Sequence, residues 1–347
     1  MENINKKKYG QFYTTNYDYI LQNLKIPDNI NNIIEPFAGN GDLLNFIKNT
    51  GKKIKCYDIE PKKSNIIKRD TLLKPPDYND KFVITNPPYL ARNKSKDKII
   101  FDKYNQNDLY KCFIINLINS NLIGGILIIP LNFWCSIRKN DIELRKKFLT
   151  KYNIITLNIF EEKVFNDTSY TICSFQFQNI NLSENNIQTN CNIYPKNKKI
   201  VFKLNKENNF TFGGHIYNLI QNKNIKIERL TKNNKNSDFI TKILVKCIDD
   251  NDKNKIKLEI IDKPYIDNTP KLSARSYASL IIKPLIDIEK QKKLCIDFNN
   301  YLNKEREQYN SLFLTNYRES NSIARKRISF TLVFKIVNYL LNDNIKI

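Results

Sequence analysis

Between Ile33 and Phe177, short runs of β-branched and aromatic residues alternate with stretches of helical periodicity. This alternation is typical of a parallel sheet whose strands are joined by crossover helices, and it constrains the fold more than any other feature of the chain. We therefore predict an α/β domain with a mostly parallel central sheet. The predicted strands are 33–35, 54–57, 82–85, 125–129, 154–157 and 171–175, and the predicted helices lie near 42–49, 108–122 and 139–151.

After Phe177 the sequence changes character. An Asn- and Lys-rich stretch from Gln178 to Lys199 lacks clear periodicity and is predicted to be a loop or linker. We place the domain boundary there, with a catalytic domain over 1–178 and a target recognition region over 179–347. A length of 347 residues suits two domains. The second is expected to be smaller and mixed, with strands near 200–204 and 256–261 and helices near 287–309 and 322–341.

The charge balance favours a polyanionic partner. The chain has 57 Lys and Arg against 35 Asp and Glu, a net charge of +22, and such a surplus attracts nucleic acid by releasing its counterions. The alternative source of the lysines is coding bias, because the chain is also rich in Asn, Ile and Tyr, as an AT-rich genome would dictate. No apolar run is long enough to span a bilayer and the N-terminus lacks a signal peptide, so we expect an intracellular, cytoplasmic protein with no membrane partner.

Metal and histidine chemistry are disfavoured by composition. The seven cysteines are spaced by at least eighteen residues and form no C-x-x-C pair, so they are interpreted as buried, reduced thiols. The chain has one histidine, His215. A zinc site or a His-centred triad would be hard to assemble from this set.

The first predicted strand is followed by a tight loop of small residues. Residues 33–42 read as a strand, a loop containing Gly39 and Gly41, and a helix start, at the place where doubly wound sheets bind a nucleotide-like ligand. Asp58 closes the second strand, where it could accept hydrogen bonds from ribose hydroxyls, and Asp70 could accept from an adenine amine. By themselves these residues fit an ordinary structural turn equally well.

The segment Thr85-Asn86-Pro87-Pro88-Tyr89 comes directly after the apolar strand at 82–84. Two prolines in a row continue neither a ladder nor a helix, so they fix a rigid loop at the carboxyl end of the strand. An exocyclic amine conjugated with its ring is a poor nucleophile. The Asn86 side-chain carbonyl and the Pro87 backbone carbonyl could hold its hydrogens and favour attack by its lone pair on a sulfonium methyl, while Tyr89 offers a face for an extruded base. The alternative is a proline-stiffened surface turn.

With these motifs in order, the chain resembles the S-adenosylmethionine-dependent amino-methyltransferases of DNA, over roughly residues 6–178. It resembles the subgroup in which the cofactor motifs precede the catalytic motif and the recognition region is C-terminal. Segment 8–14 is similar to the family's G-x-F-x-T-P motif, although Thr15 stands where proline is usual. The resemblance implies a Rossmann-like fold and the catalytic quartet Asn86, Pro87, Pro88 and Tyr89, and the composition argues for no metal. It also implies cofactor-binding roles for Tyr13, Thr14, Glu35, Phe37, Ala38, Gly39, Asn40, Gly41, Asp58, Ile59, Asp70 and Thr71.

Further segments are similar to the family's target pocket. Residues 107–113 and 124–130 correspond to its helix and strand, and 163–170 to the loop whose aromatic residue holds the flipped base; we choose Phe165, although an aromatic packed in the core fits as well. Methylation at carbon 5 of cytosine needs a Pro-Cys nucleophile, which is absent. Within the family, Asn in the quartet favours adenine N6 over cytosine N4.

The C-terminal region has two basic clusters, at 271–277 and 317–327, that suit phosphate contacts with some base reading. Each could equally be the solvated face of a helix. The second is predicted to open a helix with apolar residues every four positions, 328, 332, 336 and 340. The candidate DNA-contacting residues are Arg275, Tyr277, Arg318, Arg325, Lys326 and Arg327.

The sequence thus predicts a site-specific DNA adenine-N6 methyltransferase acting on double-stranded DNA by base flipping, from a restriction-modification or virus-encoded system. In the virus-encoded case it would act in the host cell. Two alternatives stay open: an RNA or release-factor glutamine methyltransferase with the same chemistry, and a non-catalytic DNA-binding subunit. Oligomeric state, recognition sequence and a cognate endonuclease are not determined by the sequence.

Overall fold

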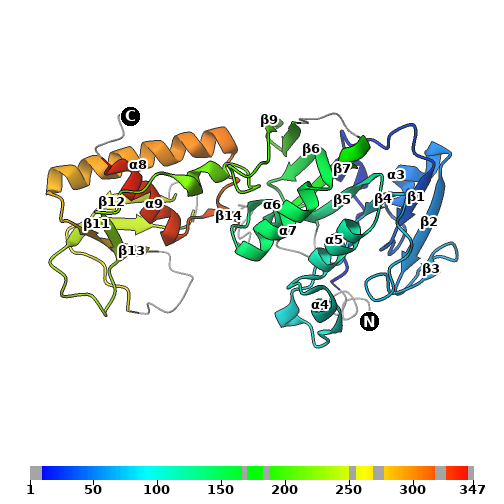
Figure 1. Ribbon diagram of the computed structural model, residues 1–347, viewed down its shortest axis with the longest axis horizontal. Helices are drawn as coiled ribbons and strands as arrows, with labels where there is room; N and C mark the ends of the chain where they lie inside the picture. Colours follow the sequence, from blue (N-terminus) through cyan, green and yellow to red (C-terminus); the bar gives the residue numbers. More distant parts are fainter. Residues whose placement is uncertain are drawn as a thin grey trace. The chain divides into compact units, whose positions relative to one another are not determined.

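The predicted β-branched runs of the first half all form strands of one nine-stranded sheet (Figure 1). The computed structural model describes residues 10–165, 170–182, 188–249, 255–268, 277–316 and 326–342. By its internal contacts the chain divides into two compact units, residues 1–133 with 137–203, and residues 134–136 with 204–347.

The sheet of the first unit has the order β3-β2-β1-β4-β5-β7-β6-β8-β9. The first five strands in this order, from β3 to β5, are parallel to one another, whereas β7 runs antiparallel between β5 and β6. Strand β8 is parallel to β6, and β9 is antiparallel to β8. The bounds are β1 Asn32–Glu35, β2 Lys53–Asp58, β3 Ile67–Lys68, β4 Phe82–Thr85, β5 Gly124–Pro130, β6 Tyr152–Phe160, β7 Ile172–Asn179, β8 Thr189–Tyr194 and β9 Lys198–Phe202.

Helices of this unit are short and come mainly between the strands. Strands β4 and β5 are buried at every position, as expected of strands covered on both faces. Helix α5 begins after Asp108 and buries most of its side chains, and α7 packs against it and against β6. The bounds are α2 Tyr17–Ile20, α3 Leu44–Ile47, α4 Ile99–Tyr104, α5 Leu109–Asn119, α6 Asn132–Cys135 and α7 Lys139–Leu149.

The linker prediction is wrong for much of its range. Strand β7 runs on to Asn179, and β8 and β9 extend the sheet to Phe202, so the first compact unit ends at Lys203 and not at 178. In β8 alternate residues are buried, but two of the buried ones are Thr189 and Cys191. An alternation of apolar and polar residues is therefore hard to recognise in its sequence.

The second unit is a four-stranded antiparallel sheet of order β10-β13-β11-β12, with α8 and α9 packed on it (Figure 1). Its core combines aliphatic residues of the sheet with one face of each helix. Asp287 caps α8 by accepting from the Lys290 amide at 2.8 Å. The bounds are β10 Lys226–Arg229, β11 Ile240–Lys246, β12 Lys257–Ile260, β13 Tyr277–Lys283, α8 Ile288–Tyr309, β14 Thr315–Asn316, β15 Lys326–Arg327 and α9 Phe330–Leu340.

The last helix begins later than predicted. Ser329 caps α9 by accepting from the Leu332 amide at 3.2 Å, and Lys326 and Arg327 form strand β15, paired with β14. The basic cluster therefore does not open this helix. Of its predicted apolar positions, Ile328 precedes the helix and is buried, as are Leu332 and Ile336 within it.

Candidate active site

The loop after β1 is shaped by a close approach. Gly39 has φ +52°, and a Cβ built there would lie 3.1 Å from the Tyr13 ring, so a side chain at this position would be strained and would press on that ring. The Gly39 amide donates to Asp58 Oδ2 at 2.7 Å. The loop after β1 is thus tied to the end of β2, where two predicted cofactor residues meet.

Two carboxylates are oriented by backbone amides. Asp58 Oδ1 accepts from the Glu60 amide at 2.8 Å, so each of its oxygens holds one N–H and keeps further acceptor capacity. Asp70 Oδ1 accepts from the amides of Leu72 and Leu73 at 3.1 and 2.9 Å. Within the described part of the chain, Asp70 Oδ2 has no hydrogen-bond partner, so it is available to a ligand.

Glu35, the last residue of β1, is fully buried. Its Oε1 accepts from the Phe37 amide at 3.1 Å and from the Thr85 hydroxyl, while Oε2 is buried without a partner in the described residues. Burial raises the pKa of this carboxyl to about 8, although the two hydrogen bonds oppose the shift. The orphaned oxygen is a place for a cationic or hydrogen-bonding group.

Asn86 is fixed by a segment far away in sequence. Its Nδ2 donates to the Phe12 carbonyl at 2.8 Å and to Thr14 Oγ1 at 3.0 Å. A 180° flip of the amide would place Oδ1 against the Phe12 carbonyl oxygen, and neither atom can donate, so Nδ2 stays on that side and Oδ1 remains an acceptor for other groups. Asn86 is 9% exposed and does not face bulk solvent.

Tyr89 is buried and lies among other rings. Its hydroxyl lies within hydrogen-bond distance of Asn86 Oδ1 and of the Ile128 carbonyl oxygen of β5, the latter at 2.7 Å, and its one hydrogen is shared between these two acceptors. Burial raises its pKa well above the ordinary value. The Phe12 ring stacks on it with centroids 5.1 Å apart. The face that was expected to receive a base is therefore covered by Phe12.

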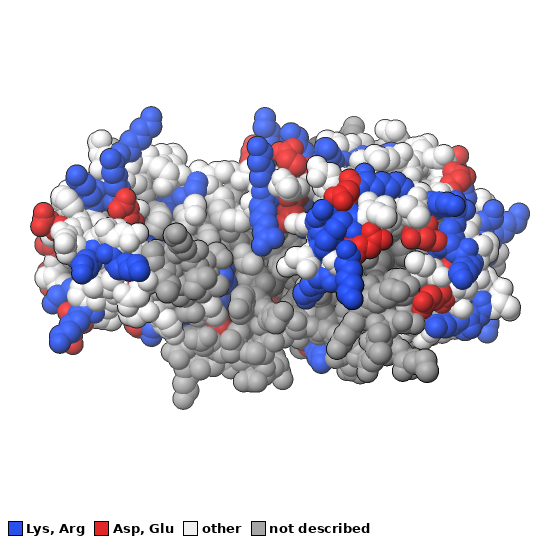
Figure 2. All heavy atoms as spheres, turned by 90° about the horizontal axis from the view of Figure 1, so that it is seen from below, with Lys and Arg blue, Asp and Glu red and all other residues white. Residues whose placement is uncertain are grey.

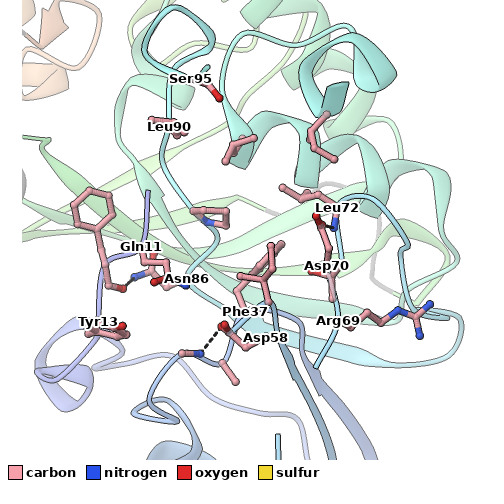
Figure 3. A pocket seen from close by; sticks show the side chains of 18 of the residues that line it. Gln11, Tyr13, Phe37, Asp58, Arg69, Asp70, Leu72, Asn86, Leu90 and Ser95 are labelled. Carbon is pink, nitrogen blue, oxygen red and sulfur yellow. Dashed lines mark hydrogen bonds between the residues drawn. The ribbon is translucent and has the colours of Figure 1, made fainter. Parts of the chain in front are cut away.

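A cavity of about 770 Å³ joins these groups, within the range of small-molecule sites. In Figure 3, Asn86, Gln11 and Tyr13 lie on one side of it and Asp70 and Leu72 on the other. The predicted residues that line it are Tyr13, Thr14, Phe37, Ala38, Gly39, Asp58, Ile59, Asp70, Thr71, Asn86 and Pro88. The other predicted residues of the first unit are not among those that line it: Glu35, Asn40, Gly41, Pro87, Tyr89 and Phe165.

Sequence reasoning missed one wall. Residues 94–97, in the loop after the quartet, line the cavity together with Ile100 and Phe101 at the start of α4. Phe101 is 1% exposed, whereas Lys94 and Lys96 are exposed. The only sequence feature that could have indicated this wall is the short apolar run 99–101 after a charged loop, and such a run is also typical of an ordinary helix.

The candidate recognition residues are only partly described. Arg275, Arg318 and Arg325 lie outside the described residues. Tyr277 pairs with Lys246 at the end of β11, and Arg327 bridges to Ile248 just beyond it, so the structure brings these two to one end of the sheet. Lys326 is 5% exposed, which limits its access to a DNA phosphate.

In the described residues no helix is long and apolar enough to cross a bilayer. The same part of the chain has no cluster of three or more His, Cys, Asp or Glu side chains suited to a metal ion. All seven cysteines are buried and free.

Residues 5–165 match the model of the Eco57I restriction-modification methylase family. The match covers less than half of the 347 residues, and it makes this segment similar to that family. The match covers the glycine loop, both cavity carboxylates and the quartet, and it confirms the predicted relationship to methyltransferases of restriction-modification systems. No curated protein matches the chain.

Several solved structures are distantly similar to this chain. A modification subunit of a putative type I restriction enzyme from Vibrio vulnificus is 13% identical over 55% of this chain and 49% of its own, with a TM-score of 0.41. A type I methyltransferase subunit from Streptococcus thermophilus is 15% identical over 56% and 50%, with a TM-score of 0.41. The EcoKI M protein is 13% identical over 66% and 60%, with a TM-score of 0.38. The chain thus spans about half the length of the first two.

Proposed function

We propose that this chain is a site-specific DNA methyltransferase that transfers a methyl group from S-adenosylmethionine to N6 of a flipped adenine. The observation that carries the proposal is the fixed amide of Asn86 in the wall of the cavity that also contains Asp58 and Asp70. The family description, a restriction-modification methylase, and the charge of +22 support DNA as the substrate.

The cavity suits the proposed cofactor. Asp58 would accept from ribose hydroxyls and Asp70 Oδ2 from the adenine amine, because each keeps acceptor capacity toward the cavity. The orphaned oxygen of Glu35 would meet the ammonium of the methionine end. When bound, S-adenosylmethionine supplies an electrophilic methyl group on a sulfonium.

The chain's own residues would then act on the target amine. Asn86 Oδ1 accepts from the Tyr89 hydroxyl and has a second lone pair for an amine hydrogen, and the Pro87 carbonyl is the second acceptor. Holding both hydrogens withdraws the nitrogen lone pair from conjugation with the ring. The same dipoles stabilise the positive charge that develops on the nitrogen, and their fixed orientation avoids reorganisation during the reaction.

The test is Asn86→Ala with labelled cofactor and duplex DNA. Losing one oriented dipole of this kind should lower kcat by about 100- to 1000-fold, with cofactor binding unchanged by calorimetry. The matched control is Asn338→Ala in the second unit, because Asn338 is also buried and donates both amide hydrogens to backbone carbonyls, each at 3.0 Å. This control should methylate as the unmodified chain does. Transfer to RNA or to a protein but to no DNA would contradict the proposal.

A further inference from the structure

The ring of Phe12 joins two aromatic residues of the proposed target site. It stacks on Tyr89 with centroids 5.1 Å apart and planes at 26°, and it lies 6.2 Å from the Phe165 ring at 36°. Among the described residues, Tyr89 and Phe165 have no ring contact with each other. Phe12 is therefore the ring that contacts both Tyr89 and Phe165.

The other neighbours of Tyr89 leave its stacking face to Phe12. Tyr110 and Tyr170 meet Tyr89 edge-on, at 90° and 85°, with centroids 6.1 and 6.3 Å away. Tyr89 is 3% exposed. Among the described residues Phe12 is the one ring stacked on Tyr89, so an extruded base that stacks on this face would have to displace it.

The backbone on either side of this ring is anchored to the quartet. The Gly10 carbonyl accepts from the Tyr89 amide at 2.9 Å, and the Phe12 carbonyl accepts from Asn86 Nδ2 at 2.8 Å. Gly10 has φ +65°, and a Cβ there would lie 2.6 Å from the Tyr89 carbonyl oxygen, so this close approach requires glycine. Because the main chain is held and the ring is only half-buried, the ring can swing by side-chain rotation while Asn86 keeps its partners.

We propose that Phe12 is a positioning residue of the target-base subsite: its ring covers Tyr89 until an extruded base displaces it. The exchange replaces one stacked ring by another, so Tyr89 is never left facing water. Gln11 to Thr14 also line the cofactor cavity, and thus the same segment contacts both ligands. This inference rests on the proposed function.

The first experiment measures base entry directly. A duplex with 2-aminopurine at the target adenine is titrated with the chain in the presence of S-adenosylhomocysteine, and the fluorescence change reports extrusion of the base. Phe12→Ala should tighten apparent binding of the extruded base by about threefold to tenfold, the factor that corresponds to one aromatic pair. Phe12→Leu, which keeps apolar volume without a flat ring, should give a smaller gain. The control Phe334→Ala removes a half-buried ring that lies 6.0 Å from the Phe330 ring at a tilt of 41° in the second unit, and it should change nothing.

Unchanged or weaker base entry in both Phe12 variants, with circular dichroism showing that they fold, would overturn the inference. That result would mean that the base stacks on Phe12 itself or enters elsewhere. A merely structural role would lower stability and kcat without raising extrusion.

A second measurement separates this inference from the proposed function. Free 2-aminopurine is titrated into Phe12→Ala without DNA, since the missing ring leaves a slot of matching shape beside Tyr89. Tighter binding than to the unmodified chain is expected, and equal binding to both counts against the ring exchange. If the chain methylates no DNA while this slot binds the free base, the proposed function fails and the displacement of Phe12 stands.

Discussion

The residues of the quartet are oriented by groups outside it. Asn86 depends on Thr14, 72 positions away, and on the Phe12 carbonyl, while Tyr89 depends on the Ile128 carbonyl of β5. The quartet can be recognised from the sequence because it is contiguous. Its supporting contacts could not be predicted, because they arise only when the N-terminal segment folds over the carboxyl ends of the strands.

Tyr89→Phe tests the hydroxyl separately from the ring. The substitution removes the one hydroxyl hydrogen that Asn86 Oδ1 and the buried Ile128 carbonyl share, so the free energy of unfolding should fall by about 1–2 kcal/mol and kcat by less than about tenfold. Urea unfolding and steady-state rates are the measurements. Tyr89→Ala, which also removes the stacking face, should lose far more activity; equal losses in the two variants would show that the ring has no separate role.

Glu35 makes cofactor binding depend on pH. Its pKa of about 8 means that the carboxyl is protonated at pH 7 in the free chain, and an ammonium placed beside it would favour the carboxylate. Binding should therefore release a proton, and affinity should rise by up to about tenfold per pH unit between pH 6 and 8. Calorimetry in buffers of different ionisation enthalpy measures the released proton, and Glu35→Gln should remove the pH dependence.

The raised pKa of Glu35 also makes the stability of the free chain depend on pH. Stability should fall as the pH rises, whereas cofactor affinity should rise. Because the folded-state pKa is raised above the ordinary value of 4.5, the folded state binds more protons between pH 4.5 and about 8. The contribution of Glu35 to stability is thus fully present below about pH 4.5 and is lost as the pH rises toward 8. The measurement is the thermal unfolding midpoint of the unmodified chain and of Glu35→Gln between pH 4.5 and 8. If the midpoint of the variant falls as steeply with pH as that of the unmodified chain, Glu35 is not the cause of the pH dependence.

At the scale of elements, the predictable parts are those whose burial follows apolar periodicity. β1, β4 and β5 were predicted nearly to their ends because both faces are covered and their residues are β-branched. β8 was missed because Thr, Asn and Cys take its buried and half-buried positions. The start of α9 was misplaced because basic residues and a following apolar repeat suit a helix, whereas Lys326 and Arg327 pair with β14.

The loop between β4 and α4 is an element with a testable role of its own. Lys94 and Lys96 are exposed at the cavity wall, in a position to meet phosphates beside an extruded base. Replacing both by alanine should reduce the slope of log affinity against log salt by about two. Lys53 and Lys55, exposed at the start of β2, are the control pair and should leave the slope unchanged. An unchanged slope in the Lys94 and Lys96 double variant would place the phosphates elsewhere.

At the scale of the whole molecule, the basic side chains and the candidate active-site residues are distributed differently. Lys and Arg are spread over the described surface of both units in the view of Figure 2, whereas the cavity and quartet belong to the first unit. The family match likewise covers 5–165 and stops before the second unit. The division into two units and the similarity of the first to restriction-modification methylases could be predicted from the sequence. Base reading could not, because a basic cluster gives no information about which bases its side chains would contact.

The central claim is that the fixed amide of Asn86 directs a methyl group to an adenine in DNA. Modification-sensitive sequencing of plasmid DNA from cells that express the chain tests it most directly, with Asn86→Ala as the comparison. We predict N6-methyladenine at one short recurring sequence with the unmodified chain and none with the variant. Plasmid DNA without any modified base, or with N4-methylcytosine in place of N6-methyladenine, would contradict this account.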